Sequence, residues 1–142
     1  MHPVPTVLHC TDSLGETRAF RAQVTDYGRG AEVKVHLHWP PREADDDFYE
    51  SRFDLCDPDC VQVSMLENRG LWHYSRKGIT PALFDLIRDL YPGRRLRFSS
   101  NLTAAKVFAT EWRSTGAERV WKALVGRGHA QYEPTEDRFY LT

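Results

Sequence analysis

Apolar and polar residues alternate over the first forty positions, and this pattern predicts β-strands. In segment 32–39 every odd-numbered position is apolar and every even-numbered position is charged or a histidine, a period of two that is typical of a sheet with one buried face. Turn-forming residues at 12–15 and 26–30 set off two earlier strands, which we expect over 4–10 and 18–25. Together the three strands predict an antiparallel meander.

An acidic segment follows at residues 42–59. Phe48, Tyr49, Phe53 and Leu55 interrupt its charges, so we expect part of the segment to pack as a short helix or lid. Its carboxylates would repel a phosphate, so we do not expect a phosphate site there.

The rest of the chain combines strands with amphipathic helices. Segment 82–91 places Leu83, Phe84 and Ile87 on one helical face. The other expected elements are strands over 60–66, 96–100, 129–133 and 138–141 and helices over 102–112 and 115–125. This order predicts an α+β fold, in which three or four helices flank a mostly antiparallel sheet of six or seven strands. We expect Phe84 and Trp121 to be buried where their helices pack on the sheet.

Length and charge limit the possible functions. A chain of 142 residues predicts a single domain, residues 1–142, which is large enough to bury a core. The net charge of −1 and the aromatic content of 12% argue against disorder and provide no overall basic field to concentrate nucleic acid. Any site for a polyanion must therefore be local. No apolar run approaches the roughly 18 residues of a membrane span, so no membrane insertion is expected.

The cysteines indicate location more than chemistry. Cys10, Cys56 and Cys60 leave at least one thiol unpaired, and no charged region followed by an apolar one opens the chain. We therefore expect a cytoplasmic protein. Cys56 and Cys60 do not predict a metal site, because no second close pair of ligands follows at a finger-like spacing. His36 and His38, two residues apart on a predicted strand, are alternative metal ligands that would need a third.

The loop before the first predicted helix has the parts of an anion site. Arg76 and Lys77 supply positive charge, Gly78 lets the backbone approach a ligand closely, and Thr80 and Pro81 are expected as the N-cap and first residue of the helix. Backbone N–H groups at such a helix start carry partial positive charge. The sequence therefore predicts a phosphate site here, and the alternative is an ordinary loop with solvated basic residues.

The order of elements resembles the later part of the GNAT acetyltransferase superfamily, over roughly residues 18–141. In that family a loop of pattern Arg/Gln-x-x-Gly-x-Gly/Ala binds the pyrophosphate of coenzyme A, and it aligns with segment 75–80, where Gly78 matches the central glycine. No room remains before residue 31 for the helix pair between the family's first two strands, so a shortened or divergent member is implied. The resemblance implies acyl transfer to a small-molecule or peptide amine, with acetyl-coenzyme A as cofactor. The implied cofactor-binding residues are Arg76, Lys77, Gly78, Ile79 and Thr80.

Acyl transfer from a thioester to an amine needs a base for the amine, a donor for the oxyanion and an acid for the thiolate. The candidate bases are Glu67, at the end of the strand before the loop, and His73. The candidate acids are Tyr132 and Tyr140 in the closing hairpin. A solvated strand-end glutamate and packed tyrosines would have the same sequence pattern.

A nucleic-acid-binding module is the alternative function. Residues 79–142 also match the element order of a winged helix, in which segment 115–125 would be the recognition helix. That helix would offer Arg119 and Lys122, and the wing would offer Arg138. Acidic residues nearby leave this face less basic than specific nucleic-acid binders usually are.

Overall fold

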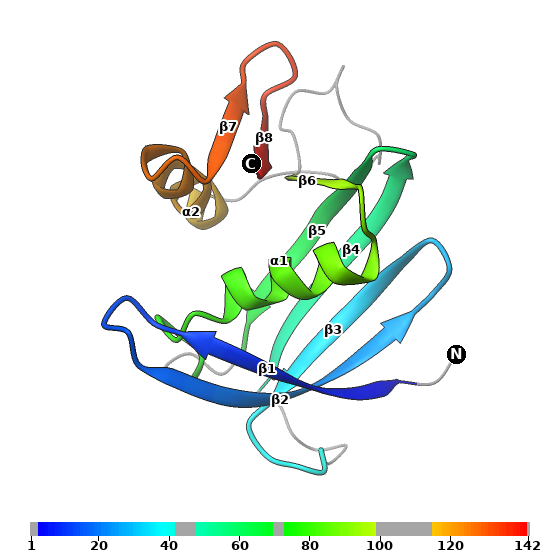
Figure 1. Cartoon of the computed structure of the whole chain (residues 1–142), viewed down its shortest axis with the longest axis vertical. Coiled ribbons are helices and arrows are strands. Elements are labelled where there is room, and N and C mark those ends of the chain that lie inside the picture. The colour runs from blue at the N-terminus through cyan, green and yellow to red at the C-terminus, as the bar shows by residue number, and fades with distance from the viewer. Residues whose placement is uncertain (1–2, 42–47, 70–72, 99–114, 142) are drawn as a thin grey trace.

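The computed structural model describes residues 3–41, 48–69, 73–98 and 115–141. In these residues one twisted sheet carries two helices (Figure 1). The strands are β1 (Val4–Thr11), β2 (Thr17–Asp26), β3 (Gly30–His36), β4 (Phe48–Asp57), β5 (Cys60–Asn68), β6 (Arg95–Phe98), β7 (Ala130–Glu133) and β8 (Arg138–Leu141), and the helices are α1 (Ile79–Leu90) and α2 (Thr115–Gly126).

The sheet has the strand order β1-β2-β3-β4-β5-β6-β8-β7. Strands β1 to β5 pair in chain order, each antiparallel to the next. β6 pairs parallel to β5. Two parallel neighbours need a long crossover connection, and the connection between these two strands contains α1. β8 pairs with both β6 and β7, so the second strand of the closing hairpin joins that hairpin to the sheet.

The predicted fold class, six or seven strands flanked by three or four helices, is wrong. Within the described residues the sheet has eight strands and carries two short helices. The additional strand is β4, in the acidic segment where a short helix or lid was expected. The predicted helix over 102–112 lies outside the described residues.

β4 is a strand because its apolar and polar residues alternate. Tyr49, Ser51 and Phe53 are buried on one face, while Glu50 and Arg52, which alternate with them, lie on the other. The high charge of the segment concealed this period of two.

Most element positions agree with the sequence prediction to within two residues, with two exceptions. β3 ends at His36, three residues before the predicted end at Trp39. α1 begins at Ile79, with Gly78 as its N-cap residue, so the prediction of Thr80 as N-cap and Pro81 as first helical residue is also wrong.

An aromatic cluster fixes both helices to one face of the sheet. The Trp121 ring of α2 is fully buried and stacks on Phe84 of α1, with 5.7 Å between ring centroids. The same ring contacts Phe98 of β6 and Phe139 of β8, at 5.2 and 6.0 Å. The predicted burial of Phe84 and Trp121 between helices and sheet is thus confirmed. Among the residues that the structure describes, neither helix is long and apolar enough to cross a membrane.

Candidate functional site

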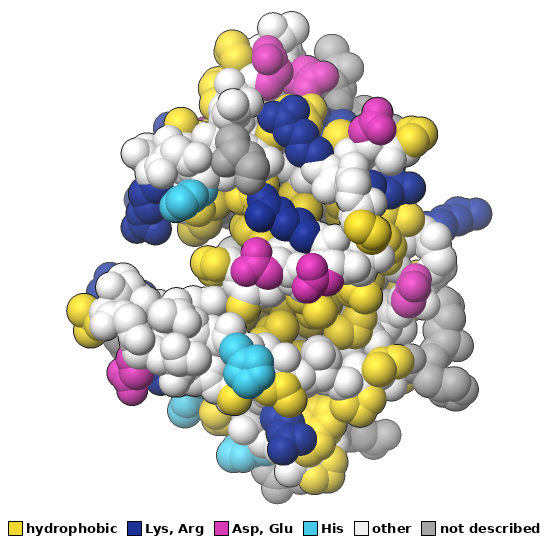
Figure 2. All heavy atoms as spheres, viewed as in Figure 1, with side chains coloured by type: hydrophobic (Ala, Val, Ile, Leu, Met, Phe, Trp, Pro, Cys, Tyr) yellow, Lys and Arg dark blue, Asp and Glu magenta, His cyan; other side chains and the backbone are white. Residues whose placement is uncertain are grey.

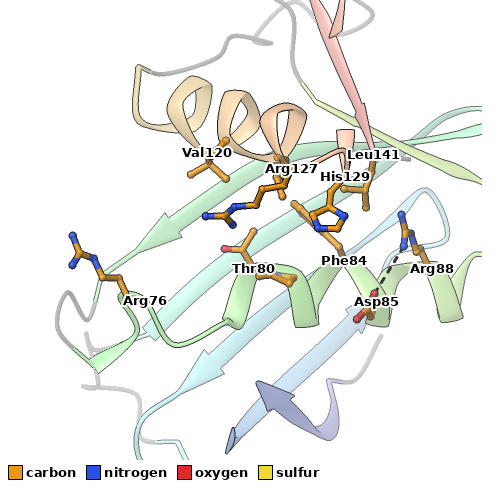
Figure 3. Close-up of a pocket in the computed structure, with 12 residues that line it drawn as sticks. Arg76, Thr80, Phe84, Asp85, Arg88, Val120, Arg127, His129 and Leu141 are labelled. Atoms are coloured by element: carbon orange, nitrogen blue, oxygen red, sulfur yellow. Dashed lines mark ion pairs between the residues drawn. The ribbon is translucent and has the colours of Figure 1, made fainter. Parts of the chain in front are cut away.

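A cavity of about 640 Å³ lies between α1 and α2 (Figure 3). We call it the α1–α2 cavity. On the outside, the surface is hollowed between the part that carries α2 and the part that carries the turn between β1 and β2 (Figure 2). The lining residues are Arg76, Thr80, Pro81, Phe84, Asp85, Arg88, Val120, Ala123, Leu124, Arg127, His129 and Leu141.

The α1–α2 cavity combines an apolar floor with a basic rim. Apolar side chains from both helices and from β8 form most of its wall. Arg88 from α1 and Arg127 from just after α2 carry positive charge, and in Figure 3 the Arg127 side chain extends over the cavity. Among the described lining residues, Asp85 is the one acidic residue, and it forms an ion pair of 4.0 Å with Arg88. With Arg76 at the rim, this lining has three arginines against one carboxylate, and so attracts an anion.

The first turn of α1 adds uncompensated backbone dipoles. The N-cap residue Gly78 has no side chain to cap this turn, and the turn contains no acidic residue. The N–H groups of Ile79 and Thr80 are among the first donors of the helix, which have no partner within the helix itself. Thr80 and Pro81 line the cavity, so the positive end of the helix dipole lies beside it.

Gly78 has a structural role that the sequence did not reveal. Its φ is 81°, and a Cβ atom at this position would lie 2.2 Å from the carbonyl oxygen of Thr11 at the end of β1. The close backbone approach that requires a glycine is therefore to Thr11.

The structure places the five predicted cofactor-binding residues in different environments. Arg76 and Thr80 line the α1–α2 cavity, whereas Lys77, Gly78 and Ile79 do not. Arg76 is exposed with a φ of 55°, an uncommon backbone conformation for a residue other than glycine. Ile79 is buried in the core.

Glu67 lies on the face of the sheet opposite α1. It pairs with Glu50 across the strands, and Glu50 pairs with Lys34. The neighbour of Glu50, Tyr49, contacts α1 through a hydrogen bond to Thr80, and adjacent residues of a strand point to opposite faces. The Glu67 carboxylate pairs with the Arg69 guanidinium at 3.3 Å, and both side chains are about half exposed.

His73 and Tyr132 also lie outside the lining of the α1–α2 cavity. His73 is exposed in the turn before α1. Tyr132 lies on β7 and donates a hydrogen bond of 2.7 Å to Asp137 Oδ1. Tyr140 on β8 similarly donates to Glu136 Oε2 at 2.7 Å. None of the predicted catalytic residues lines the cavity that the cofactor candidates Arg76 and Thr80 share.

Sequence reasoning missed several residues of the cavity. The sequence pattern identified the apolar face of segment 82–91 but not Asp85 and Arg88, which line the cavity beside α2. Arg127 lies just behind the predicted recognition helix of the nucleic-acid alternative and His129 opens a predicted strand, so neither was expected in a cavity. The sequence did indicate two amphipathic helices that pack on the sheet. Which residues of the two helices face each other depends on how Trp121 packs against Phe84, and the sequence did not show this contact.

The histidine pair does not form a metal site in the described residues, where no group of three His, Cys, Asp or Glu side chains is placed to hold a metal ion. β3 ends at His36, so the strand alternation that would bring His38 to the same side does not continue. The His36 ring instead packs near Trp39 and Phe48, with centroids 6.3 and 6.5 Å away.

The residues of the nucleic-acid alternative are divided between surface and interior. Arg119 and Lys122 are exposed on α2. Arg138, the expected wing residue, is buried and donates hydrogen bonds to Gln62 Oε1 and the Phe98 carbonyl oxygen, both at 3.0 Å. Arg138 is therefore not available on the surface of a wing.

Comparisons of the chain with protein-family models, with curated proteins and with solved structures find no match. We therefore infer the function from the site itself.

Proposed function

We propose that the protein binds an acyl-coenzyme A in the α1–α2 cavity and transfers its acyl group to the amine of a small molecule or peptide. The observation that carries the proposal is the composition of this cavity. An apolar wall, arginines from two separate elements and an uncapped helix start meet in one space of about 640 Å³. Small-molecule sites typically enclose about 300–1,000 Å³ and are mostly apolar with a few placed polar groups.

Coenzyme A has the matching chemistry. Its phosphates would interact with the Arg88 and Arg127 guanidinium groups and with the first turn of α1, because arginine forms bidentate hydrogen bonds to phosphate and helix starts bind anions. Its pantetheine arm would lie against Phe84 and Leu124, which belong to the apolar wall. The Asp85–Arg88 pair would orient that guanidinium.

The transfer step depends on the resemblance to the acetyltransferases and on the candidate residues Glu67, His73 and Tyr132. A base must deprotonate the acceptor amine before it attacks the thioester carbonyl. Glu67 is half exposed at the end of β5, where an acceptor could reach it. The cytoplasmic location expected from the cysteines is part of the same proposal, since acyl-coenzyme A is an intracellular donor.

The first prediction concerns ligand binding to the intact protein. Acetyl-coenzyme A at 100 times its dissociation constant should stabilise the fold by about 2.7 kcal/mol, a rise of about 5–11 °C in the melting temperature. Arg127→Ala should weaken binding about 3- to 10-fold, because it removes a charge-assisted hydrogen bond at the rim. Thermal unfolding and titration calorimetry measure the two effects.

Arg119→Ala is the matched control, because Arg119 is an exposed arginine of α2 that does not line the cavity. It should leave affinity for acetyl-coenzyme A unchanged. If acetyl-coenzyme A does not stabilise the wild-type protein, or if both arginine variants weaken binding equally, the cavity is not the site. Binding of labelled DNA or RNA that depends on Arg119 and Lys122 would instead support the nucleic-acid alternative.

A further inference from the structure

A buried hydroxyl group touches the wall of the α1–α2 cavity from behind. The Tyr49 hydroxyl of β4 lies 2.9 Å from Thr80 Oγ1 in the first turn of α1. Tyr49 is 8% exposed, and its ring packs edge-on against Tyr74 with 6.3 Å between centroids. Thr80 in turn lines the cavity. Tyr49 therefore contacts a cavity residue without lining the cavity itself.

The direction of this hydrogen bond follows from counting protons. Within the described parts of the chain, the hydroxyl groups of Tyr49 and Thr80 have no other hydrogen-bond partner. If Thr80 donated, the Tyr49 proton would be buried without an acceptor among the described residues, which costs about 1–3 kcal/mol. If Tyr49 donates, no buried proton is left unpaired, because the Thr80 proton can point to the cavity. The 2.9 Å distance alone allows either direction, and this count of protons leads us to assign Tyr49 as the donor.

Burial also keeps Tyr49 protonated. Removal of the phenol from water raises its pKa, because a charged phenolate is disfavoured in an apolar environment. The phenol therefore keeps its proton, and can donate it, up to a higher pH than an exposed tyrosine.

We propose that Tyr49 is a positioning residue for the bound ligand: by donating to Thr80 Oγ1, it directs the Thr80 proton into the α1–α2 cavity, toward a phosphate oxygen. This inference rests on the proposed function, since it takes the ligand beside Thr80 to be a phosphate ester. Thr80 is a donor in the second position of α1, next to the backbone N–H groups that favour the same anion. Arg127, just after α2, extends toward the cavity from the other side (Figure 3).

This arrangement determines the kind of group that binds next to Thr80. Thr80 Oγ1 accepts from Tyr49 with one of its two lone pairs, so the group that Thr80 turns toward the ligand is its proton. A phosphate oxygen, which only accepts, matches it. An ammonium or amide N–H in the same place would meet a donor, so the ligand should place its phosphates at the start of α1.

A double-mutant cycle tests the inference. Wild type, Tyr49→Phe, Thr80→Val and the double variant are titrated with coenzyme A and with inorganic pyrophosphate by calorimetry. Thr80→Val should weaken binding about 10-fold, since it removes a hydrogen bond to a charged phosphate oxygen. Tyr49→Phe should weaken binding about 3-fold, since the Thr80 hydroxyl remains but is no longer held in one orientation. In the Thr80→Val background, Tyr49→Phe should change nothing further, because Tyr49 acts through the lost hydroxyl.

Thr80→Ser separates this role from a packing role, because serine keeps the hydroxyl and loses the methyl group. Thr80→Ser should bind within about 2-fold of wild type, and Tyr49→Phe should again cost about 3-fold in this background. Equal losses from Tyr49→Phe in the wild-type and Thr80→Val backgrounds would overturn the inference, and so would a loss in Thr80→Ser as large as that in Thr80→Val. The comparison of Thr80→Ser with Thr80→Val stands even if Tyr49→Phe proves too unstable to titrate.

The two probes distinguish this inference from the proposed function. If pyrophosphate shows the coupling but coenzyme A binds no more tightly than pyrophosphate, the role of Tyr49 holds and the proposed function fails. If coenzyme A binds and the cycle shows no coupling, the proposed function holds and the role of Tyr49 fails. If the wild-type protein binds neither probe, both are overturned.

Discussion

Gly78 illustrates how one residue can fit two interpretations. The sequence placed it in an anion-binding loop, where a glycine allows close backbone approach to a phosphate. In the structure its φ of 81° and the carbonyl group of Thr11 both exclude a side chain. The glycine is required because α1 begins directly against the end of β1. This contact sets the direction in which the first turn of α1 starts.

Gly78→Ala should therefore destabilise the protein by about 2–5 kcal/mol, the combined cost of a left-handed conformation and of a steric overlap in a packed region. Urea unfolding measures the change. Gly93→Ala is the matched control, because Gly93 has almost the same φ, 80°, but a Cβ atom there would meet nothing within 4 Å. It should cost only about 1–2 kcal/mol. Equal costs for the two substitutions would show that Thr11 does not constrain position 78.

Pro81 explains why the start of α1 was misplaced. A threonine followed by proline is the usual pattern of an N-cap and first helical residue. In the structure Pro81 is the third residue of α1. A proline is tolerated there because its missing N–H belongs to the first turn, whose donors have no helical partner in any case. The left-handed conformation of Gly78 allowed the helix to begin earlier, and Thr80 was left to bond to Tyr49.

At the scale of elements, the sequence pattern of a single strand or helix was enough to predict which of its faces is buried. The alternation in β3 and the apolar stripe of α1 indicated their buried faces, and Val33, Val35, Leu83 and Ile87 are all fully buried. β4 was missed because the many carboxylates of its segment concealed the alternation of buried and exposed residues. The α1–α2 cavity could not be predicted, because it depends on how two helices far apart in sequence meet over Trp121.

Trp121 should be the residue on which the position of α2 depends. Its ring is fully buried and contacts α1, β6 and β8 at once, so Trp121→Ala should cost about 3–5 kcal/mol in chemical unfolding. Trp121→Phe should cost clearly less. It keeps most of the ring contacts and removes the indole Nε1, which is buried without a hydrogen-bond partner in the described residues.

The adjacent Val120 supplies the control for this prediction. Val120 is 44% exposed, so Val120→Ala should change the free energy of unfolding by no more than about 0.5 kcal/mol. A similar loss in Val120→Ala and Trp121→Ala would mean that α2 is rotated relative to the sheet. The wall of the α1–α2 cavity would then be different.

For the whole molecule, the sheet separates the proposed donor site from the candidate base. The α1–α2 cavity lies on the helical face, and Glu67 points to the other face. β6 pairs with β5 only from Cys60 to Val63, whereas β5 continues to Asn68. In the described residues, the last part of β5 has no partner strand on the β6 side. For Glu67 to act as the base, the thioester arm has to pass this edge from the helical face to the face that carries Glu67.

Glu67→Gln should therefore reduce acetyl transfer about 10²- to 10⁴-fold and leave the affinity for acetyl-coenzyme A within about 2-fold, because Glu67 does not line the cavity.

Glu50→Gln is the informative comparison, since Glu50 lies directly opposite Glu67 on the same face. Burial raises the pKa of Glu50, so this carboxylate takes up a proton at a higher pH than an ordinary glutamate. If Glu50→Gln abolishes turnover and Glu67→Gln does not, the base is Glu50, and the rate should fall as the pH drops through its raised pKa. If both variants retain full turnover, neither carboxylate deprotonates the amine, and the transfer step must use a group on the helical face of the sheet.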